Sequence, residues 1–377
     1  MNLPVPCPHR PPCPGCPRYG QRGLSRAVRQ TLNRLAADAG LPEPPLQEGT
    51  AEGYRHRARL MVRGRSQSPK VGIFQRGTHR IVDIPTCRVH HWRINEVAAA
   101  LKHSIRATGV APYAERPHRG DLRAVQLVVE RSSQRVQLVL VGNADSPAPL
   151  AALFDALREE LGDVLHSLWW NGNPERTNRI LGPCWQRLEG EPFVRESIAG
   201  AQVFFPPGAF GQSHLDLADR LVERVAAWVP AGATVAEFYA GCGAIGLGLA
   251  SRCRELRMNE RSPEAVEGLR RGIEELPEPV RDRIRMLAGD ASEAGEAVSG
   301  ADVVIADPPR KGLDRGLLDA LCGDAPARLI YLRCDLTSLE RDLTLLSDGG
   351  GLVLRGLEAF ALFPYSEHVE TLALLER

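Results

Sequence analysis

The sequence lacks any long apolar segment, although 43% of its 377 residues are hydrophobic. No apolar run reaches the roughly 18 residues that a membrane-spanning helix needs. The N-terminal stretch MNLPVPCPHRPPCPGCPRYG also lacks the apolar core of a secretion signal. We therefore expect a cytoplasmic protein without membrane contact, in which thiols stay reduced. The chain is too long for one typical domain and suits two.

The sequence also has almost no net charge, but its charges are unevenly distributed. The formal net charge is +1 at pH 7. Residues 1–150 hold 23 Lys and Arg against 10 Asp and Glu, whereas residues 151–377 hold 24 against 36. A basic half indicates contact with a polyanion, although a solvated arginine-rich surface would give the same counts.

Internal repeats are absent too, and the pattern of apolar residues changes near residue 200. Before that point the pattern is α+β, with predicted helices at 21–40, 92–108 and 149–161 and predicted strands at 54–63, 70–75, 79–84, 125–130, 136–141 and 164–171. Residues 41–49 read as a linker. From residue 214 onward strands and helices alternate, which predicts an α/β fold with a doubly wound, mostly parallel sheet. We expect a cysteine-rich segment 1–20, a central domain 21–200 and a C-terminal domain 201–377.

The nine cysteines are better suited to metal binding and catalysis than to disulfides in a reducing compartment. Cys7, Cys13 and Cys16 lie close together among prolines, and Cys87 lies far away along the chain. This spacing is typical of a metal site, and four thiolates suit either structural zinc or a [4Fe–4S] cluster. Cys184, Cys242, Cys253 and Cys322 show no comparable pattern, and we assign them no role.

A glycine-rich turn follows the predicted strand 234–240. Gly241, Gly243 and Gly246 form a GxGxxG pattern, which lets a ligand approach the backbone. Glu260 ends the next predicted strand, where a carboxylate can hold both ribose hydroxyls of an adenosyl ligand. A dinucleotide dehydrogenase, or a tight turn without a ligand, would show the same pattern.

Three further motifs follow, two at the ends of apolar strands and one near the start of the last strand. Asp307-Pro308-Pro309-Arg310 comes first, and Asp307 is expected to face the ligand crevice of a doubly wound sheet. Cys334 comes next, just before a predicted helix near residue 336. Such a thiol is a candidate nucleophile, although a lone cysteine at a strand end is usually inert. Glu370, near the start of the last strand, is either a solvated end or a positioned base, and the residues alone favour the solvated end.

Taken in this order, the motifs resemble those of the RNA uracil-5-methyltransferase family, over nearly the whole chain. The DPPR turn, the strand with Cys334 and the HVET ending carry the resemblance. It implies a C-terminal Rossmann-like class I methyltransferase domain that uses S-adenosylmethionine, preceded by an α+β RNA-binding domain that includes YRHRAR (54–59). It also assigns Cys7, Cys13, Cys16 and Cys87 to an N-terminal [4Fe–4S] site. Because the cysteines begin at residue 7, we expect no TRAM domain, as in the short bacterial enzymes that modify 23S ribosomal RNA.

The resemblance also implies a role for individual residues. Cys334 would add to C6 of the target uridine, and Glu370 would remove the proton from C5. Arg310 would lie beside the target base. The expected cofactor contacts are Gln212, Tyr239, Gly241, Gly243, Glu260 and Asp307.

The sequence departs from the family pattern at several of these positions. Arg333 and Asp335 flank Cys334, where the family commonly has Ser and Asn. His214 replaces an Asn that follows the glutamine, and the glycine-rich motif has Glu237 and Ala240 in place of Asp and Cys. An aspartate near the thiol would raise the thiol pKa by charge repulsion.

The expected function is methylation of C5 of a specific uridine in RNA, most simply 23S ribosomal RNA, by a monomer. Three alternatives stay open at this point. The target could be uridine 54 of transfer RNA, the enzyme could methylate C5 of cytosine in RNA, or the protein could bind RNA with an inactivated methyltransferase site.

Overall fold

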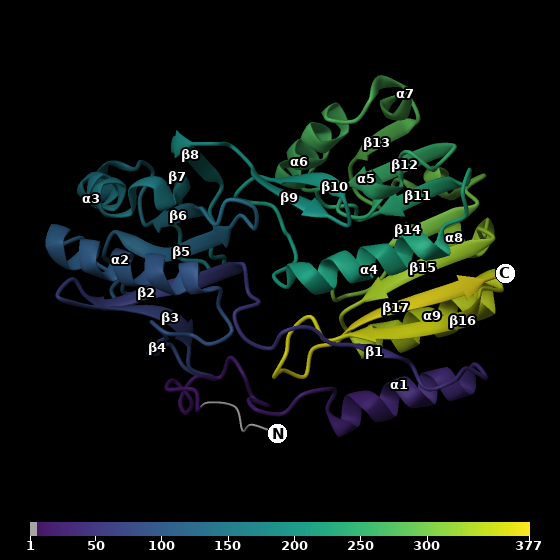
Figure 1. Ribbon diagram of the computed structural model, residues 1–377, viewed down its shortest axis with the longest axis horizontal. Helices are drawn as coiled ribbons and strands as arrows, with labels where there is room; N and C mark the ends of the chain where they lie inside the picture. Colours follow the sequence, from purple (N-terminus) through teal and green to yellow (C-terminus); the bar gives the residue numbers. More distant parts are fainter. Residues whose placement is uncertain (1–5) are drawn as a thin grey trace. The chain divides into compact units, whose positions relative to one another are not determined.

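The computed structural model describes residues 6–377 and divides into two compact units (Figure 1). The N-terminal unit comprises the residues up to Gly20 together with Thr50–Val194, and the C-terminal unit comprises Gln21–Gly49 together with Arg195–Arg377. The N-terminal unit holds 23 Lys and Arg against 14 Asp and Glu, and the C-terminal unit holds 24 against 32. Within residues 6–377, no helix combines the length and the apolar character that crossing a membrane requires.

The two units do not follow the predicted division into 1–20, 21–200 and 201–377. Residues 21–49, predicted to belong to the central domain, group with the C-terminal unit. The cysteine-rich segment groups with the N-terminal unit instead of standing alone, and its first five residues lie outside the described part. The cause is packing, because apolar side chains of residues 21–49 enter the core of the C-terminal unit.

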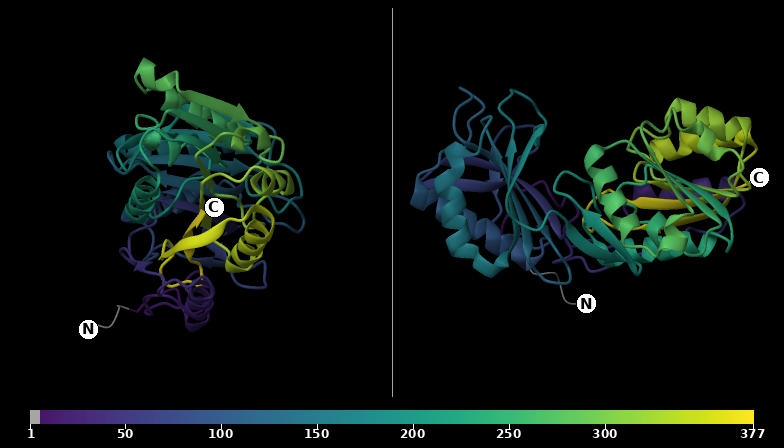
Figure 2. Two further views of the ribbon diagram at one scale, coloured as in Figure 1. Left: turned by 90° about the vertical axis from the view of Figure 1, so that its right-hand side faces the viewer. Right: turned by 90° about the horizontal axis from the view of Figure 1, so that it is seen from above.

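The N-terminal unit is built on a seven-stranded sheet with two helices on one face (Figure 2). Its strand order is β4 (Ile81–Asp83), β3 (Ser68–Phe74), β2 (Arg57–Arg65), β5 (Leu122–Val129), β6 (Val136–Gly142), β7 (Leu165–Gly172) and β8 (Cys184–Gly190). All neighbours are antiparallel except β6 and β7, which helix α3 (Ala151–Leu161) connects. Helix α2 (Trp92–Thr108) buries Ile94, Val97, Leu101 and Ile105 at helical spacing against the sheet.

Strand β8 was not predicted from the sequence, and its burial explains why. Its residues are exposed or half-buried at every position, so the strand lacks the alternation of apolar and polar side chains that marks a half-buried strand. Its backbone hydrogen bonds to β7 define it instead.

The C-terminal unit contains an eight-stranded sheet and a separate pair of short strands, β9 (Val194–Ile198) and β10 (Ala201–Phe205). The order is β1 (Leu46–Gln47), β16 (Val353–Phe360), β17 (Glu370–Glu376), β15 (Arg328–Arg333), β14 (Val303–Ala306), β11 (Thr234–Phe238), β12 (Glu255–Glu260) and β13 (Ile284–Ala288). Only β17 runs antiparallel to its neighbours. The helices are α4 (Leu215–Trp228), α5 (Gly246–Leu249), α6 (Pro263–Glu274), α7 (Glu278–Arg281), α8 (Arg315–Gly323) and α9 (Leu336–Gly350).

The strand order of this sheet reverses between β11 and β14. From β11 the chain moves outward through β12 and β13 and then returns to the other side of β11. Ligands bind at such a switch point, outside the carboxyl ends of the parallel strands. The predicted doubly wound, mostly parallel sheet is therefore present, and its switch point lies between β11 and β14.

Helix α1 (Arg26–Asp38) and β1 complete the C-terminal unit from a distant part of the sequence. Leu32, Leu35 and Ala36 are buried in the core of this unit. Arg34 donates both ends of its guanidinium to Glu340, at 2.8 and 2.9 Å. Strand β1, inside the predicted linker, pairs in parallel with β16.

We expect Leu32→Ala to destabilise the C-terminal unit, because Leu32 is 1% exposed and its removal leaves a cavity. The loss should be about 2–5 kcal/mol. Hydrogen exchange should show reduced protection in β15 and β17 with unchanged protection in β5 and β6. Arg34→Ala is the control, since an exposed ion pair contributes about 1 kcal/mol or less. Equal loss of protection in both units would contradict the assignment of α1.

Candidate active site

The glycine-rich turn and the DPPR turn meet at the carboxyl ends of the adjacent strands β11 and β14. The backbone N–H of Asp307 donates to the carbonyl of Phe238 at 3.4 Å. The Tyr239 hydroxyl donates to Asp314 Oδ2 at 3.1 Å and accepts from the Asp314 N–H at 3.2 Å. Two motifs about 70 residues apart are thus tied together at the switch point.

The glycine-rich turn itself depends on left-handed backbone conformations. Tyr239, Gly241 and Gly243 have φ angles of 60°, 57° and 85°. A Cβ at Gly243 would lie 2.7 Å from the Leu269 side chain, so the position accepts only glycine without rearrangement. The helix predicted to follow this turn, α5, has only four residues. Polar contacts to a ligand must therefore come from the turn and not from a helix dipole.

Glu260 braces this turn from the end of β12. Its Oε2 accepts from the Gly241 N–H at 2.8 Å, and its Oε1 accepts from the N–H groups of Arg261 and Ser262 at 2.8 and 2.7 Å. A carboxylate offers about four acceptor positions, so this half-buried group retains capacity for a ligand hydroxyl. In the structure the Glu260 carboxylate holds the glycine-rich turn through the Gly241 N–H.

Glu237 lies below the turn with one carboxylate oxygen unused. The residue is 2% exposed, and its Oε2 has no hydrogen-bond partner among residues 6–377. Burial, with a smaller contribution from Asp307, raises the pKa of Glu237 to about 8. A buried acid without a cationic partner is costly once it ionises.

The DPPR turn is held from beneath by Arg333, the last residue of β15. Arg333 is fully buried and donates to the carbonyls of Pro308, Pro309 and Arg310, at 3.0, 2.7 and 2.8 Å. It also donates to the hydroxyl of Ser338. This departure from the family pattern therefore serves the turn and leaves the Arg310 side chain exposed.

Cys334 and Glu370 are brought together by the antiparallel pairing of β15 with β17. Arg333 pairs with Thr371, whose hydroxyl donates to the Arg333 carbonyl at 2.8 Å. The next residue on one strand and the preceding residue on the other are Cys334 and Glu370. Glu370 is 6% exposed, so the expectation of a solvated strand end was wrong.

Burial and neighbouring acids raise the pKa values of Cys334 and of the groups around it. Burial, followed by the nearby Glu370, raises the pKa of the Cys334 thiol. Burial, followed by Asp307, also raises the pKa of Glu370. Burial raises the pKa of Asp307 to about 6, although Arg333 acts in the opposite direction.

Asp335 does not act on the thiol as the sequence suggested. It is the N-cap of α9, where its Oδ1 accepts from the Ser338 N–H and the Ser338 hydroxyl, both at 2.9 Å. The backbone hydrogen bond from Ser338 lowers the pKa of Asp335. The second departure from the family pattern is thus a helix cap.

The predicted contact Gln212 lies half-buried in the loop before α4, and within residues 6–377 no hydrogen bond ties it to the groups above. His214 is buried and packs so closely on Gly49 that a Cβ on Gly49 would lie 2.5 Å from the His214 ring.

The sequence analysis did not single out Phe210, which lies two residues before Gln212 and whose side chain is 71% exposed. It also missed Asp290, an acid two residues after the end of β13 that lines a cavity of about 530 Å³ together with Asn259. The sequence did carry a signal for Asp290, because an acid that follows a parallel strand lies at the same edge of the sheet as the other strand ends.

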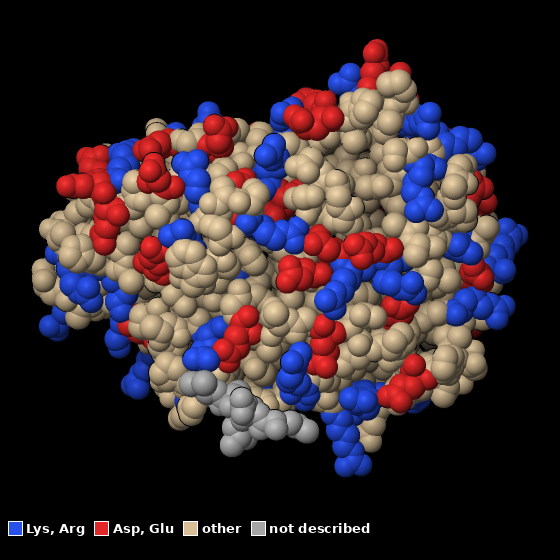
Figure 3. Space-filling view, in the orientation of Figure 1, with Lys and Arg blue, Asp and Glu red and all other residues tan. Residues whose placement is uncertain are grey.

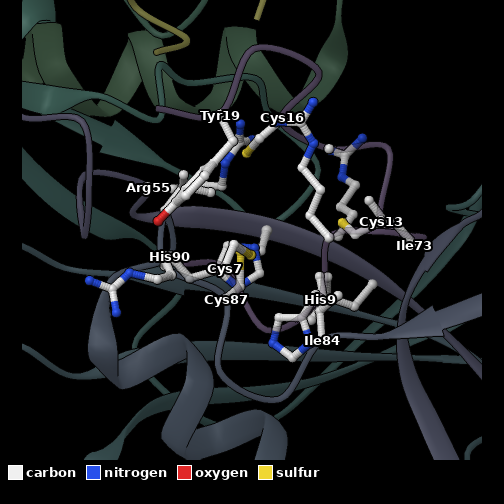
Figure 4. A pocket seen from close by; sticks show the side chains of 17 residues that line it. Cys7, His9, Cys13, Cys16, Tyr19, Arg55, Ile73, Ile84, Cys87 and His90 are labelled. Carbon is white, nitrogen blue, oxygen red and sulfur yellow. The ribbon is translucent and has the colours of Figure 1, made fainter. Parts of the chain in front are cut away.

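The four predicted metal ligands lie around one cavity in the N-terminal unit (Figure 4). Cys7, Cys13, Cys16 and Cys87 line a space of about 170 Å³. Burial, followed by the other three cysteines, raises the pKa of Cys16 to about 12. The thiols are therefore close enough to repel one another when ionised.

Among residues 6–377, no three His, Cys, Asp or Glu side chains converge closely enough to hold one ion. The cysteines instead surround an open space, and all four are free of disulfides.

The fold defines a doubly wound α/β protein whose sheet has its switch point between β11 and β14. No family model matches the chain. The chain is 38% identical, over 98% of its length and 97% of the relative's, to a protein of Protochlamydia amoebophila named an uncharacterized RNA methyltransferase. A protein of the same description from Gloeobacter violaceus is 33% identical over 98% of this chain and 84% of its own.

Among solved structures, a tRNA (uracil-54, C5)-methyltransferase of Pyrococcus abyssi, in complex with S-adenosyl-L-homocysteine, has a similar fold. The TM-score is 0.76 at 24% identity, over 92% of this chain and 81% of that one. The sequence relatives establish the family, because they are more than 30% identical to this chain over nearly its whole length. The chain belongs to the RNA methyltransferases.

The raised pKa of Glu237 predicts a pH dependence of stability. Between about pH 4.5 and pH 8 the unfolded carboxyl ionises while the folded one stays protonated, so the unfolding free energy falls as pH rises. Glu237→Gln removes this contribution. We expect the variant to lose less stability than the wild type in urea denaturation between the two ends of this window. Glu278→Gln, at an exposed position in α7, is the control and should follow the wild type. A Glu237→Gln profile parallel to the wild type would contradict the buried, unpaired carboxyl.

Proposed function

We propose that the protein transfers a methyl group from S-adenosylmethionine to C5 of a uridine in RNA, through a covalent adduct of Cys334. The pairing of β15 with β17 carries the proposal, because it puts a thiol and a buried carboxyl side by side. Both stand next to Asp307 at the switch point. A nucleophile and a base on one edge of a crevice are what C5 methylation needs.

The chemistry follows from the weak nucleophilicity of uracil C5. The Cys334 sulfur adds to C6 as a thiolate, and the C4–C5–C6 unit becomes an enolate. C5 then attacks the donor methyl group, and the electron pair of the broken bond stays on the donor sulfur. The Glu370 carboxylate removes the C5 proton, and the thiolate leaves from C6 as the double bond re-forms.

The charges of the crevice favour a cationic ligand. Glu237, Asp307 and Glu370 are acids whose burial raises their pKa, and Glu237 retains an unpaired oxygen. A sulfonium and an ammonium group would stabilise the ionised carboxyls, whereas a pyrophosphate would be repelled. The same argument disfavours a dinucleotide and so a dehydrogenase. Tyr239, Gly241, Gly243, Glu260, Asp307 and Gln212 are the proposed contacts of S-adenosylmethionine.

The RNA substrate is proposed from the family and from the basic N-terminal unit. A paired uridine cannot expose C6 to a thiol, so the target must be flipped out or lie in a loop. Arg310, exposed at the DPPR turn, is the proposed contact to that base. We propose 23S ribosomal RNA as the substrate, and mass-spectrometric mapping of 5-methyluridine in ribosomal and transfer RNA, with and without the gene, tests it.

We expect variants of the two catalytic residues to fail at different steps. Cys334→Ala cannot form the adduct, so it should bind RNA without cross-linking. Glu370→Gln can add and methylate but cannot remove the C5 proton, so it should accumulate a methylated covalent complex on denaturing gels. RNA with 5-fluorouridine at the target should trap the wild type, because fluorine cannot leave as a cation.

Cys322→Ala, in α8, is the matched thiol control and should cross-link like the wild type. Absence of a shifted band in the wild type would refute the covalent mechanism. RNA binding without any methyl transfer would instead support an RNA-binding protein with an inactivated site.

We also propose that Cys7, Cys13, Cys16 and Cys87 hold a [4Fe–4S] cluster. A cluster is wider than one ion, so its four thiolate ligands surround a cavity, as these side chains do around a space of about 170 Å³. Metal binding would also remove the cost of ionising crowded thiols. Through Cys7, Cys13 and Cys16 on one side and Cys87 on the other, the cluster would link the N-terminal segment to the loop after β4 within the same unit.

Protein purified without oxygen should be brown and contain about four irons per chain. Cys87→Ser should lose both colour and iron, whereas Cys184→Ser, at an exposed position on β8, should keep them. Stoichiometric zinc with no iron would contradict the cluster.

A further inference from the structure

The sheet of the N-terminal unit has a groove on the face that its helices leave open. Two adjoining cavities of about 570 and 1210 Å³ share Arg63, Tyr113, Glu115 and Arg176 in their linings. Met61, Ala124 and Val141 form a small apolar cluster there, separate from the core under the helices. Figure 2 shows loops on the side of the sheet opposite α2 and α3.

The groove is strongly basic. Eight different Lys and Arg side chains line its two cavities, against one acid, Glu115. Glu115 is already engaged by Arg63 at 3.1 Å and by His79 at 2.6 Å. Five of the cations are exposed and form no side-chain hydrogen bond or ion pair within residues 6–377, namely Lys70, Arg80, Arg116, Arg176 and Arg179. The face shown in Figure 3 instead mixes both signs of charge.

A buried arginine fixes the loop that carries two of these cations. Arg123 is 7% exposed and donates to the carbonyls of Asn173, Glu175 and Thr177 in the loop between β7 and β8. The Asn173 side chain donates in turn to the carbonyls of Arg179 and Ile180, at 2.8 and 3.0 Å. The loop is therefore held from inside the protein.

The positive charge inside the groove is fixed in the same way. The guanidinium groups of Arg63 and Arg123 lie 5.0 and 4.5 Å from the centre of the Tyr113 ring. Arg123 gives its hydrogen bonds to carbonyls and not to a carboxylate, so its charge is left uncancelled. Preformed positive charge along an extended groove favours a polyanionic chain over a small ligand.

We propose that this groove binds the phosphodiester backbone of a single-stranded RNA segment, with Arg176 and Arg179 on its phosphates. The proposal rests on the RNA substrate proposed above and names the surface that holds RNA outside the reacting nucleotide. It also places part of the RNA surface beyond residue 150, where the charge counts along the sequence did not. Contacts to phosphate would fix position and not sequence.

The test compares two double variants of the full chain. Arg176→Ala/Arg179→Ala removes two groove cations, and Arg106→Ala/Arg158→Ala removes two cations from helices α2 and α3 on the other face. A labelled, unstructured oligouridylate is titrated by fluorescence anisotropy at several salt concentrations. For the groove variant we expect about tenfold weaker binding and a slope of log K against log salt reduced by about 1.4, since each lost phosphate contact contributes about 0.7. The helix variant should bind like the wild type.

Equal losses in the two double variants, or an unchanged salt slope, would overturn the groove. The covalent assay keeps this outcome separate from the proposed reaction. With saturating RNA, the groove variant should still cross-link to 5-fluorouridine RNA, since Cys334 and Glu370 are intact. If the wild type cross-links but the groove variant binds normally, only the groove fails. If the groove variant binds more weakly but the wild type never cross-links, only the covalent reaction fails.

Discussion

The buried guanidinium of Arg333 is the interaction on which the site depends. It donates to three consecutive carbonyls of the DPPR turn, in addition to the hydrogen bonds that the Gly312 N–H gives to Pro309 and the Ser338 hydroxyl gives to Arg310. The same residue ends β15, pairs with Thr371 and precedes Cys334. One residue therefore links these parts: its side chain holds the turn that carries Asp307, and its backbone pairs the strand before Cys334 with the strand that carries Glu370. A serine at this position could not reach all three carbonyls.

The acids of the crevice form a second constraint, because they are buried without equal positive charge. Arg333 offsets part of the charge of Asp307 and Glu370, but its hydrogen bonds go to carbonyls. The pKa values of Glu237, Asp307 and Glu370 rise as a result. Burial of this kind costs stability, and in the proposed reaction the cationic methyl donor would offset part of that cost. This combination is typical of an active site, where stability is exchanged for reactivity.

The N-terminal unit uses buried polar groups in the same manner for a different purpose. Arg123 and Asn173 satisfy carbonyls of the loop between β7 and β8, as Arg333 does for the DPPR turn. In each case an irregular segment gains a fixed shape because a buried donor replaces the missing secondary-structure partner. The exposed side chains on these segments, Arg310 in one unit and Arg176 and Arg179 in the other, are the ones that we propose contact RNA.

Much of the fold followed from local sequence patterns. The alternation of strands and helices after residue 214 determined the doubly wound sheet, and the strands leading to Tyr239, Asp307 and Cys334 were visible as apolar runs. The order of motifs along the chain predicted an RNA methyltransferase, and the sequence relatives confirm that family. Strand β8 and the pairing of β1 with β16 could not be predicted, because neither leaves an apolar pattern in its own residues.

Tertiary structure alone decided the environment of each site residue. The sequence favoured a solvated Glu370, but the pairing with β15 buries this residue. The sequence suggested that Asp335 raises the pKa of the thiol, but in the structure Asp335 is the N-cap of helix α9. The sequence likewise could not show that residues 21–49 return to the C-terminal unit. The physical reason is common to these cases. Local patterns report which side chains prefer burial, whereas burial of a charged group depends on partners that lie far away along the chain.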